Sequence, residues 1–188
     1  MKYNPEKHHR QSIRLEGYDY SQSGNHFITI STCNRELFFN TNSDLKEIVE
    51  NEWKDISNRY SHVLVDEFVI MPNHIYGIIT VGATLAVARN KRNERAGAQN
   101  GRNERAGARP APTVGDVVGS FKSLCVKKWL QFINMHNLPE IVKIWQHNYY
   151  EHIIRNEKEL NQIREYIINN PLKWEFDKEN PKNWGANT

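Results

Sequence analysis

The stretch that decides the fold is HVLVDEFVIMPNHIYGIITV, residues 62–81. It contains two runs, 62–70 and 74–81, that are rich in β-branched and aromatic residues and are typical of strands. Met71-Pro72-Asn73 stands between them, and proline and asparagine both favour turns. The stretch therefore predicts a β-hairpin with a tight connection.

The flanking sequence supplies further elements. Upstream, residues 26–32 predict a strand, and residues 43–59 predict a helix with Ser43 as its N-cap. Downstream, the patterns predict an amphipathic helix over 114–132, a strand within 142–154, and a last helix from near Asn156 to Asn170, before Pro171. The first six elements follow the split βαβ, or ferredoxin-like, order. We expect an α+β fold in which an antiparallel sheet carries helices on one face, plus a C-terminal tyrosine-bearing helix.

Length and composition indicate one domain. The 188 residues suffice for a single core, so we assign residues 1–188 to one domain. Residues 82–113 contain RNERAGA twice, at 92–98 and 102–108, and we expect a mobile, basic inserted loop there. Two interpretations stay open: an arm that grips phosphate, or an expansion tolerated at a loop tip.

The sequence also restricts where the protein acts. Hydrophobic residues make up 38% and charged residues 25%, and no apolar run reaches the roughly 20 residues of a membrane helix. The first residues lack the apolar segment of a signal peptide, so we expect a cytoplasmic protein without a membrane partner. Cys33 and Cys125 lack the spacing of a disulfide framework or a zinc site.

Two places carry residues that can do chemistry. Side chains alternate along a strand, so His74 and Tyr76 should share a face; His74 is either a metal ligand or a hydrogen-bonded surface histidine. A tyrosine ligates a metal only after it loses a proton, which is costly because its pKa is near 10. In the last helix Tyr166 and Asn170 lie four residues apart on one flank of the apolar stripe. Tyr166 is either a nucleophile or an amphipathic tyrosine whose ring packs.

Together these segments resemble a known family, the HUH single-tyrosine transposases, and particularly the relatives associated with repetitive extragenic palindromes (REP). The matching segments occur in the family's order along most of the chain outside the insert. They are residues 12–15, 17–21, 27–30, 34–35, 71–74, 121–123, 145–146 and 166–171.

The resemblance implies DNA strand cleavage and transfer. Tyr166 matches the family's nucleophile, which attacks a phosphate of single-stranded DNA and forms a covalent 5′-phosphotyrosine. His74 and Asn170 match ligands of a divalent cation, Mg or Mn, that polarises the phosphate. The DNA partner implied is a single strand with hairpins or palindromic repeats, bound by a monomer or a homodimer. A non-catalytic binder of such DNA and a ferredoxin-like RNA-binding module are the alternatives.

This chain departs from the family at one ligand, because Tyr76 stands where the family has a second histidine. Three outcomes remain open: Tyr76 ligates as a phenolate, His74 and Asn170 hold a weakened metal site with water, or the protein binds DNA without cleaving it. Lys122, Lys127 and Arg14 are the basic residues that we expect at DNA phosphates, although charges on a solvated face are the usual interpretation.

Overall fold

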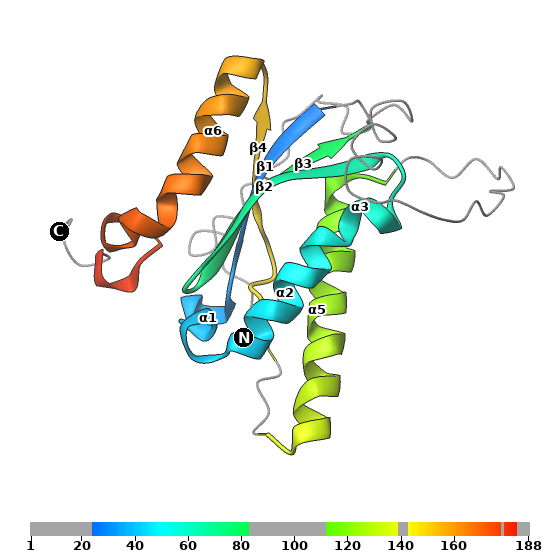
Figure 1. Cartoon of the computed structure of the whole chain (residues 1–188), viewed down its shortest axis with the longest axis vertical. Helices are drawn as coiled ribbons and strands as arrows, with labels where there is room; N and C mark the ends of the chain where they lie inside the picture. The colour runs from blue at the N-terminus through cyan, green and yellow to red at the C-terminus, as the bar shows by residue number, and fades with distance from the viewer. Residues whose placement is uncertain (1–23, 83–111, 139–142, 178, 184–188) are drawn as a thin grey trace, which may run out of the picture.

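The computed structural model describes residues 24–82, 112–138, 143–177 and 179–183. Its centre is a four-stranded antiparallel sheet with the strand order β2-β3-β1-β4 (Figure 1). The strands are β1 (Gly24–Ser31), β2 (Val63–Met71), β3 (His74–Val81) and β4 (Tyr150–Ile154). The α+β class and the antiparallel sheet predicted from the sequence are confirmed.

The predicted hairpin is formed by β2 and β3. Met71 pairs with His74, so only Pro72 and Asn73 make the connection. The register shifts between Val65 and Phe68, where an irregularity interrupts the ladder of β2. Because the turn fixes the register, it also fixes which side chains of β3 face each side of the sheet.

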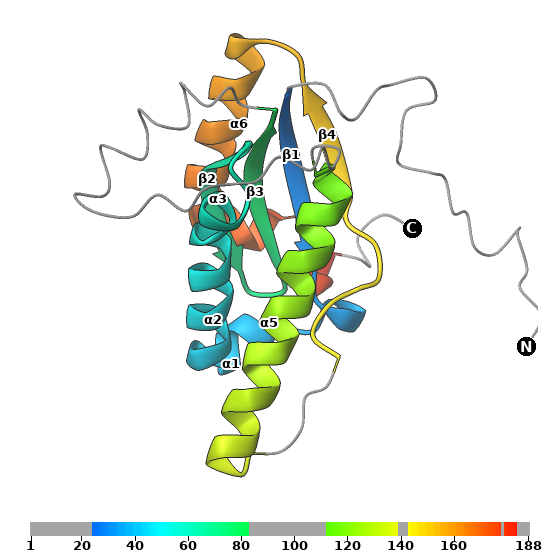
Figure 2. The same ribbon diagram turned by 90° about the vertical axis from the view of Figure 1, so that its right-hand side faces the viewer.

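One face of the sheet is covered by α2 (Ser43–Lys54) and α5 (Val114–His136), as Figures 1 and 2 show. The α5 helix begins with a capping box in which Thr113 and Asp116 satisfy each other's backbone N–H groups. Trp53 of α2 lies directly over Gly77 of β3, where a β-carbon would stand 2.2 Å from the indole ring. The large core, which includes Trp53, Ile75, Phe121 and Trp129, lies on this side.

The opposite face carries α6 (Glu157–Asn169), visible on the other side of the sheet from α2 and α5 in Figure 1. Asn156 caps it by accepting from the Glu159 backbone N–H, and Leu160 and Ile167 pack with Tyr76 and Ile78 in a second, smaller core. Arg164 fixes the helix to β2 through Asp66, with its Nη2 2.5 Å from the carboxylate. The predicted C-terminal tyrosine-bearing helix is therefore confirmed, and it lies on the face that the first two helices leave open.

The short elements complete the chain. They are η1 (Cys33–Arg35), α1 (Phe38–Thr41), α3 (Ile56–Arg59), η2 (Asn170–Phe176) and η3 (Pro181–Asn183). Two of them, η2 and η3, extend the chain beyond α6 as 3-10 turns. Pro171 stands in the first turn of η2, where its missing N–H is tolerated, so the chain continues past the predicted helix end at Asn170.

Several predicted boundaries are wrong. The helix expected over 43–59 breaks at Asp55 into α2 and α3, and Arg59 reaches back across the break to Glu52 at 2.7 Å. Ser43 is not the N-cap: Asn42 precedes the helix, and its side-chain amide donates to the Phe38 carbonyl instead. The strand expected within 142–154 is confined to β4, with one isolated bridge between Thr32 and Trp145.

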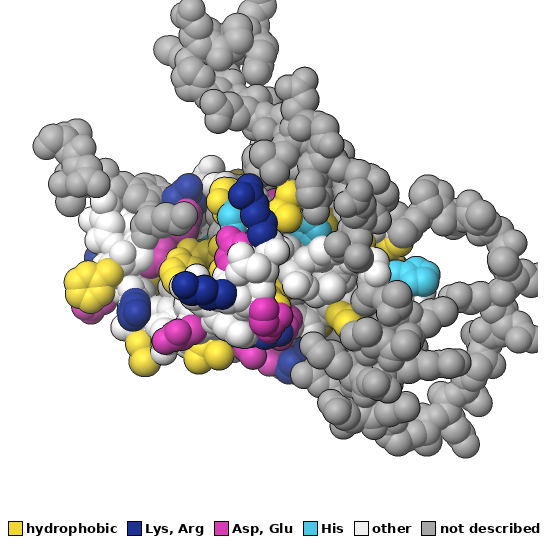
Figure 3. Space-filling view, turned by 90° about the horizontal axis from the view of Figure 1, so that it is seen from above, with side chains coloured by type: hydrophobic (Ala, Val, Ile, Leu, Met, Phe, Trp, Pro, Cys, Tyr) yellow, Lys and Arg dark blue, Asp and Glu magenta, His cyan; other side chains and the backbone are white. Residues whose placement is uncertain are grey.

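Most of the basic insert, 83–111, lies outside the described residues, so its mobility and its interaction with phosphate stay predictions. Across the described ranges, no helix combines the length and the apolar character that crossing a bilayer needs. Figure 3 shows one end of the molecule, where basic and acidic side chains alternate over the described part. No broad patch of a single sign is visible among those residues on that face.

Candidate active site

The turn of the β2–β3 hairpin builds one wall of the site. Asn73 is fully buried, and its amide nitrogen donates to the carbonyl oxygens of Arg35 (3.2 Å) and Glu179 (2.8 Å). Both partners are acceptors, so the end of the amide that faces them is the nitrogen. The amide oxygen therefore faces the opposite way and lies 2.8 Å from Nδ1 of His74. Asn73 thus joins three distant segments and orients the imidazole.

His74 is fully buried at the start of β3. Since Asn73 offers an acceptor, Nδ1 carries the proton, and in the neutral imidazole the lone pair then belongs to Nε2. Nε2 lies 3.9 Å from Oδ2 of Asp177, and the Trp174 ring centroid lies 6.1 Å from that of the imidazole. A metal-binding histidine is typically held in this way, through a hydrogen bond from its other nitrogen.

Tyr76 lies on the same face as His74, as the strand alternation predicts, with ring centroids 4.3 Å apart. Phe27 stacks on its other side at 5.4 Å. Burial raises the pKa of Tyr76 well above its usual value, and the hydrogen bond with Tyr166 and the charge of Asp177 raise it further. These surroundings favour the neutral phenol, which is a poor metal ligand.

Tyr166 meets this group from α6. Its hydroxyl donates to the hydroxyl of Tyr76 at 3.3 Å, and its ring stands edge-on to Phe27 at 6.1 Å. The residue remains 45% exposed, so Tyr166 is partly open to solvent. The ion pair between Arg164 and Asp66 holds this part of α6 against the sheet.

Asn170 follows one turn after Tyr166 and is 4% exposed. Its side-chain oxygen is buried and has no hydrogen-bond partner among the described residues. A buried oxygen without a hydrogen bond costs about 1–3 kcal/mol of stability. The position is therefore suited to a hydrogen-bond donor or a cation that binds this oxygen.

Asp177, which the sequence analysis did not single out, is the carboxylate of the site. It lies just beyond η2, and its Oδ2 accepts from the Tyr76 hydroxyl at 3.4 Å. Its Oδ1 accepts from the Glu179 backbone N–H at 2.7 Å. The sequence offered one signal, an acidic residue seven positions after Asn170, but not that the 3-10 turn brings it back to β3.

The donor atoms of His74, Asn170 and Asp177 are of types that bind divalent cations. An imidazole nitrogen with a fixed tautomer, a buried amide oxygen and a carboxylate oxygen are ordinary ligands of such ions. Among the described residues, no three His, Cys, Asp or Glu side chains are grouped so that they could hold a metal. A cation here would therefore need a further donor of another type, such as the amide oxygen of Asn170 or water.

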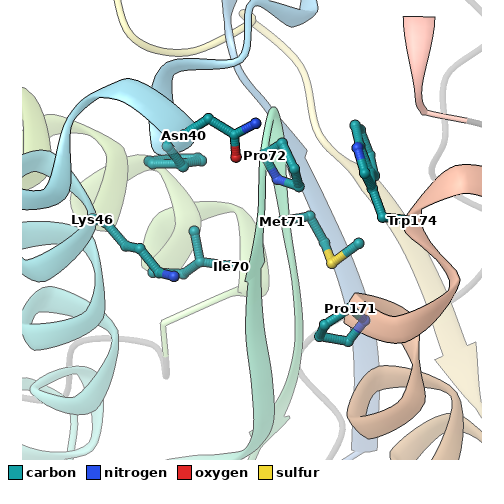
Figure 4. A pocket seen from close by; sticks show the side chains of 8 residues that line it. Asn40, Lys46, Ile70, Met71, Pro72, Pro171 and Trp174 are labelled. Atoms are coloured by element: carbon teal, nitrogen blue, oxygen red, sulfur yellow. The ribbon is translucent and has the colours of Figure 1, made fainter. Parts of the chain in front are cut away.

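A pocket of about 240 Å³ adjoins the site. Figure 4 shows its lining on both sides of the β2–β3 hairpin, with Lys46 and Ile70 on the α2 side and Pro171 and Trp174 on the η2 side. Trp174 is shared, because it also lies beside His74. The pocket is mostly apolar and contains Lys46 as its one cation.

The three basic residues expected at DNA differ in their environment. Lys122 donates to the carbonyl oxygens of Gln146 (2.9 Å), His147 (3.2 Å) and Asn148 (3.0 Å), and burial lowers its pKa to about 8. Its ammonium group is thus engaged inside the protein. Lys127 is exposed on α5. Arg14 lies outside the described residues.

Comparison with known proteins gives a relative in sequence and more distant relatives in structure. No family model matches the chain. A crystal structure of a candidate transposase from Deinococcus radiodurans is 14% identical, with a TM-score of 0.46 over 83% of this chain and 95% of that one. The structure of a REP-associated tyrosine transposase bound to a REP hairpin is 20% identical, with a TM-score of 0.49 over 88% of this chain and 77% of that one.

The sequence relative is an uncharacterized protein of Haemophilus influenzae strain Rd. It is 40% identical over 183 residues, which are 94% of this chain and 96% of the relative. The chain belongs to the family of this Haemophilus influenzae protein.

Proposed function

We propose that the protein cleaves and transfers single-stranded DNA through a covalent 5′-phosphotyrosine on Tyr166. The observation that carries the proposal is the hydrogen bond of 3.3 Å that joins the hydroxyl of Tyr166, a partly exposed residue, to the buried Tyr76, beside His74. A nucleophile must reach solvent while its ring is held, and Tyr166 meets both requirements.

The reaction forms a bond between the Tyr166 oxygen and phosphorus, and breaks the bond from phosphorus to the 3′-oxygen. The proton that Tyr166 gives up balances the proton that the 3′-oxygen takes. Because the phosphodiester is exchanged rather than hydrolysed, a 3′-hydroxyl can reverse the step and join strands. Phe27 and Tyr76 restrict the motion of the Tyr166 ring before attack.

His74 and Asn170 would hold Mg or Mn in this scheme. The bound ion would withdraw charge from the scissile phosphate. Asn73 keeps the tautomer of His74 in which Nε2 carries the lone pair. Of the three outcomes left open by Tyr76, burial of the phenol, which raises its pKa, speaks against ligation as a phenolate.

We assign the DNA strand to the pocket beside Trp174. An unpaired base can stack on an indole ring, and Lys46 offers a cation for the backbone phosphate. Lys46→Ala should weaken binding of a fluorescent single strand in an anisotropy titration. Lys54→Ala, which removes an exposed lysine paired with Glu50 on the same helix, is the matched control and should leave it unchanged.

The direct test uses a labelled hairpin-bearing single strand with Mn²⁺ or Mg²⁺ and looks for a protein–DNA adduct that resists SDS. Wild-type protein and Tyr150→Phe should form it, since Tyr150 is a similarly exposed tyrosine on β4. Tyr166→Phe should not. An adduct that persists in Tyr166→Phe would show that the nucleophile is assigned wrongly.

A second candidate function is a binder of structured single strands that does not cleave them. The observation that favours it is Tyr76, whose neutral phenol replaces a nitrogen ligand. In that case binding would survive EDTA, and no adduct would form with any metal. Dimerisation and a cytoplasmic location stay predictions under either function.

A further inference from the structure

We propose that Asp177 is a direct ligand of the divalent cation and supplies the donor that Tyr76 does not. This inference rests on the metal site of the proposed function and extends it to a residue that no sequence pattern assigned. The carboxylate of Asp177 and the imidazole of His74 come from segments 103 positions apart in the chain and face each other in the core of the site.

The separation of the two groups fits a shared ion. Nε2 of His74 and Oδ2 of Asp177 are 3.9 Å apart. Two ligands that each lie about 2.0–2.2 Å from one cation can be separated by no more than about 4.4 Å. Both atoms can therefore reach one ion, although they would have to move closer together to occupy adjacent positions of an octahedral site, and they are too far apart for a strong hydrogen bond.

The backbone holds Asp177 in place. Its Oδ1 is occupied by the Glu179 N–H at 2.7 Å, and its own N–H donates to the Trp174 carbonyl at 3.1 Å. Its carbonyl accepts from the side chain of Asn183 at 2.8 Å. Oδ2 faces His74 and also accepts from the Tyr76 hydroxyl, and a ligating carboxylate is oriented in advance of binding by such contacts.

A cation would also compensate the charge of Asp177. The Asp177 side chain is 2% exposed, and its ion-pair partner among the described residues is His74, which offsets the charge only when it is protonated. Burying a carboxylate is costly unless its charge is compensated. A divalent ion between Asp177 and His74 would supply that compensation.

Tyr76 then has a different role from the one it would have as a ligand. Its hydroxyl donates to Oδ2 of Asp177, at 3.4 Å, and accepts from Tyr166. A phenol that donates to a ligating carboxylate positions that ligand. In this proposal, the carboxylate of Asp177 replaces the ligand that is missing because Tyr76 stands in place of a histidine. Mg and Mn prefer a carboxylate to a neutral phenol.

The test measures metal binding by the full chain without DNA. Free Mn²⁺ is followed by electron paramagnetic resonance in wild type, Asp177→Asn and Glu175→Gln. Asp177→Asn should bind Mn²⁺ at least about tenfold more weakly. Glu175→Gln removes the same charge two residues away, at an exposed position, and should bind within about twofold of wild type. Equal Mn²⁺ affinity in Asp177→Asn and wild type would overturn the proposal.

A second variant separates ligation from a mere ion pair between Asp177 and a protonated His74. Asp177→Cys offers a thiolate, which prefers soft metals, so it should lose affinity for Mn²⁺ and gain affinity for Cd²⁺ relative to wild type. The gain is read from the ultraviolet absorption of the cadmium–thiolate bond, with wild-type protein as the reference for Cys33 and Cys125. If Asp177 has only a structural role, Asp177→Cys gains no affinity for Cd²⁺. That result would contradict the proposal.

The two proposals fail in different ways. If wild type forms no adduct with DNA but Asp177→Asn loses Mn²⁺ binding, strand transfer is wrong and the ligand assignment stands. If the adduct forms on Tyr166 and Asp177→Asn binds Mn²⁺ like wild type, the ligand assignment is wrong and the function stands.

Discussion

The Tyr166 hydroxyl donates a hydrogen bond of 3.3 Å to the Tyr76 hydroxyl, although the two residues are 90 positions apart. This contact joins α6 to β3 and places the exposed phenol of the last helix next to the buried start of the third strand. In the sequence, the strand pattern places His74 on one face of a strand, and the helical spacing places Tyr166 and Asn170 on one flank of a helix. Neither pattern shows that these two surfaces meet. The hydrogen bond brings these surfaces into one site.

Replacing Tyr76 by histidine should strengthen metal binding. The side chain at this position lies beside the imidazole of His74, with 4.3 Å between the ring centroids, and an added neutral nitrogen is a better ligand than a phenol. We expect Tyr76→His to raise the Mn²⁺ affinity about tenfold. Tyr76→Phe, which adds no nitrogen, should show no gain. Equal affinities for Tyr76→His and Tyr76→Phe would mean that position 76 does not face the ion.

Asn73 should be the residue of the turn on which stability depends most. Asn73→Ala leaves two carbonyl oxygens and the His74 N–H without their buried partner, so we expect a loss of about 3 kcal/mol in the free energy of unfolding. Urea titration measures it. Asn58→Ala removes an exposed amide that bonds to Asp55 and should change stability by less than about 0.5 kcal/mol. Similar losses in the two variants would refute the role of Asn73.

Two glycines should respond in opposite directions to alanine. At Gly77 the new β-carbon would meet the Trp53 ring at 2.2 Å, and the indole is buried against Phe68 and Phe121, so we expect a loss of about 2 kcal/mol. At Gly119, inside α5, the β-carbon would meet no described atom within 4 Å, and alanine favours the helix by about 0.5–1 kcal/mol. Thermal melts of both variants measure the difference, and a stabilised Gly77→Ala would show that α2 does not lie over β3 in this way.

Cys125 should make the fold weaker at alkaline pH. The thiol is buried in α5, and burial raises its pKa well above its ordinary value near 9.0. At a pH between the thiol pKa of the unfolded chain and the raised pKa of the folded protein, the unfolded chain has lost the thiol proton and the folded protein keeps it. The free energy of unfolding therefore falls as the pH rises above about 9. The free energy of unfolding of wild type minus that of Cys125→Ala should fall by on the order of 1 kcal/mol from pH 8 to pH 10. A difference that does not change with pH would contradict the burial of this thiol.

The parts of the fold that local sequence encodes were predicted well. The alternation of residues 74–81 places Ile75 and Tyr76 on opposite faces, and they indeed belong to the two separate cores. The hairpin follows from Pro72 and Asn73. The helical period of residues 157–169 sets Leu160 and Ile167 on the buried side. Each of these features depends on neighbours within a few residues.

The features that depend on distant segments were missed. Lys122 has the position of a surface lysine on an amphipathic helix, but the carbonyls of residues 146–148 surround its amino group. Asp177 is one acidic residue among several in the C-terminal segment until η2 and the Glu179 backbone turn it toward His74. No local pattern shows either contact, because both depend on how the chain returns to the sheet.

The most direct test of the account identifies the tyrosine that carries DNA. The SDS-resistant adduct is digested with nuclease and trypsin, and the modified peptide is found by mass spectrometry. We expect a nucleotide on Tyr166, the single tyrosine of the tryptic peptide EYIINNPLK, residues 165–173. An adduct in which this peptide is unmodified and another tyrosine carries the nucleotide would contradict it.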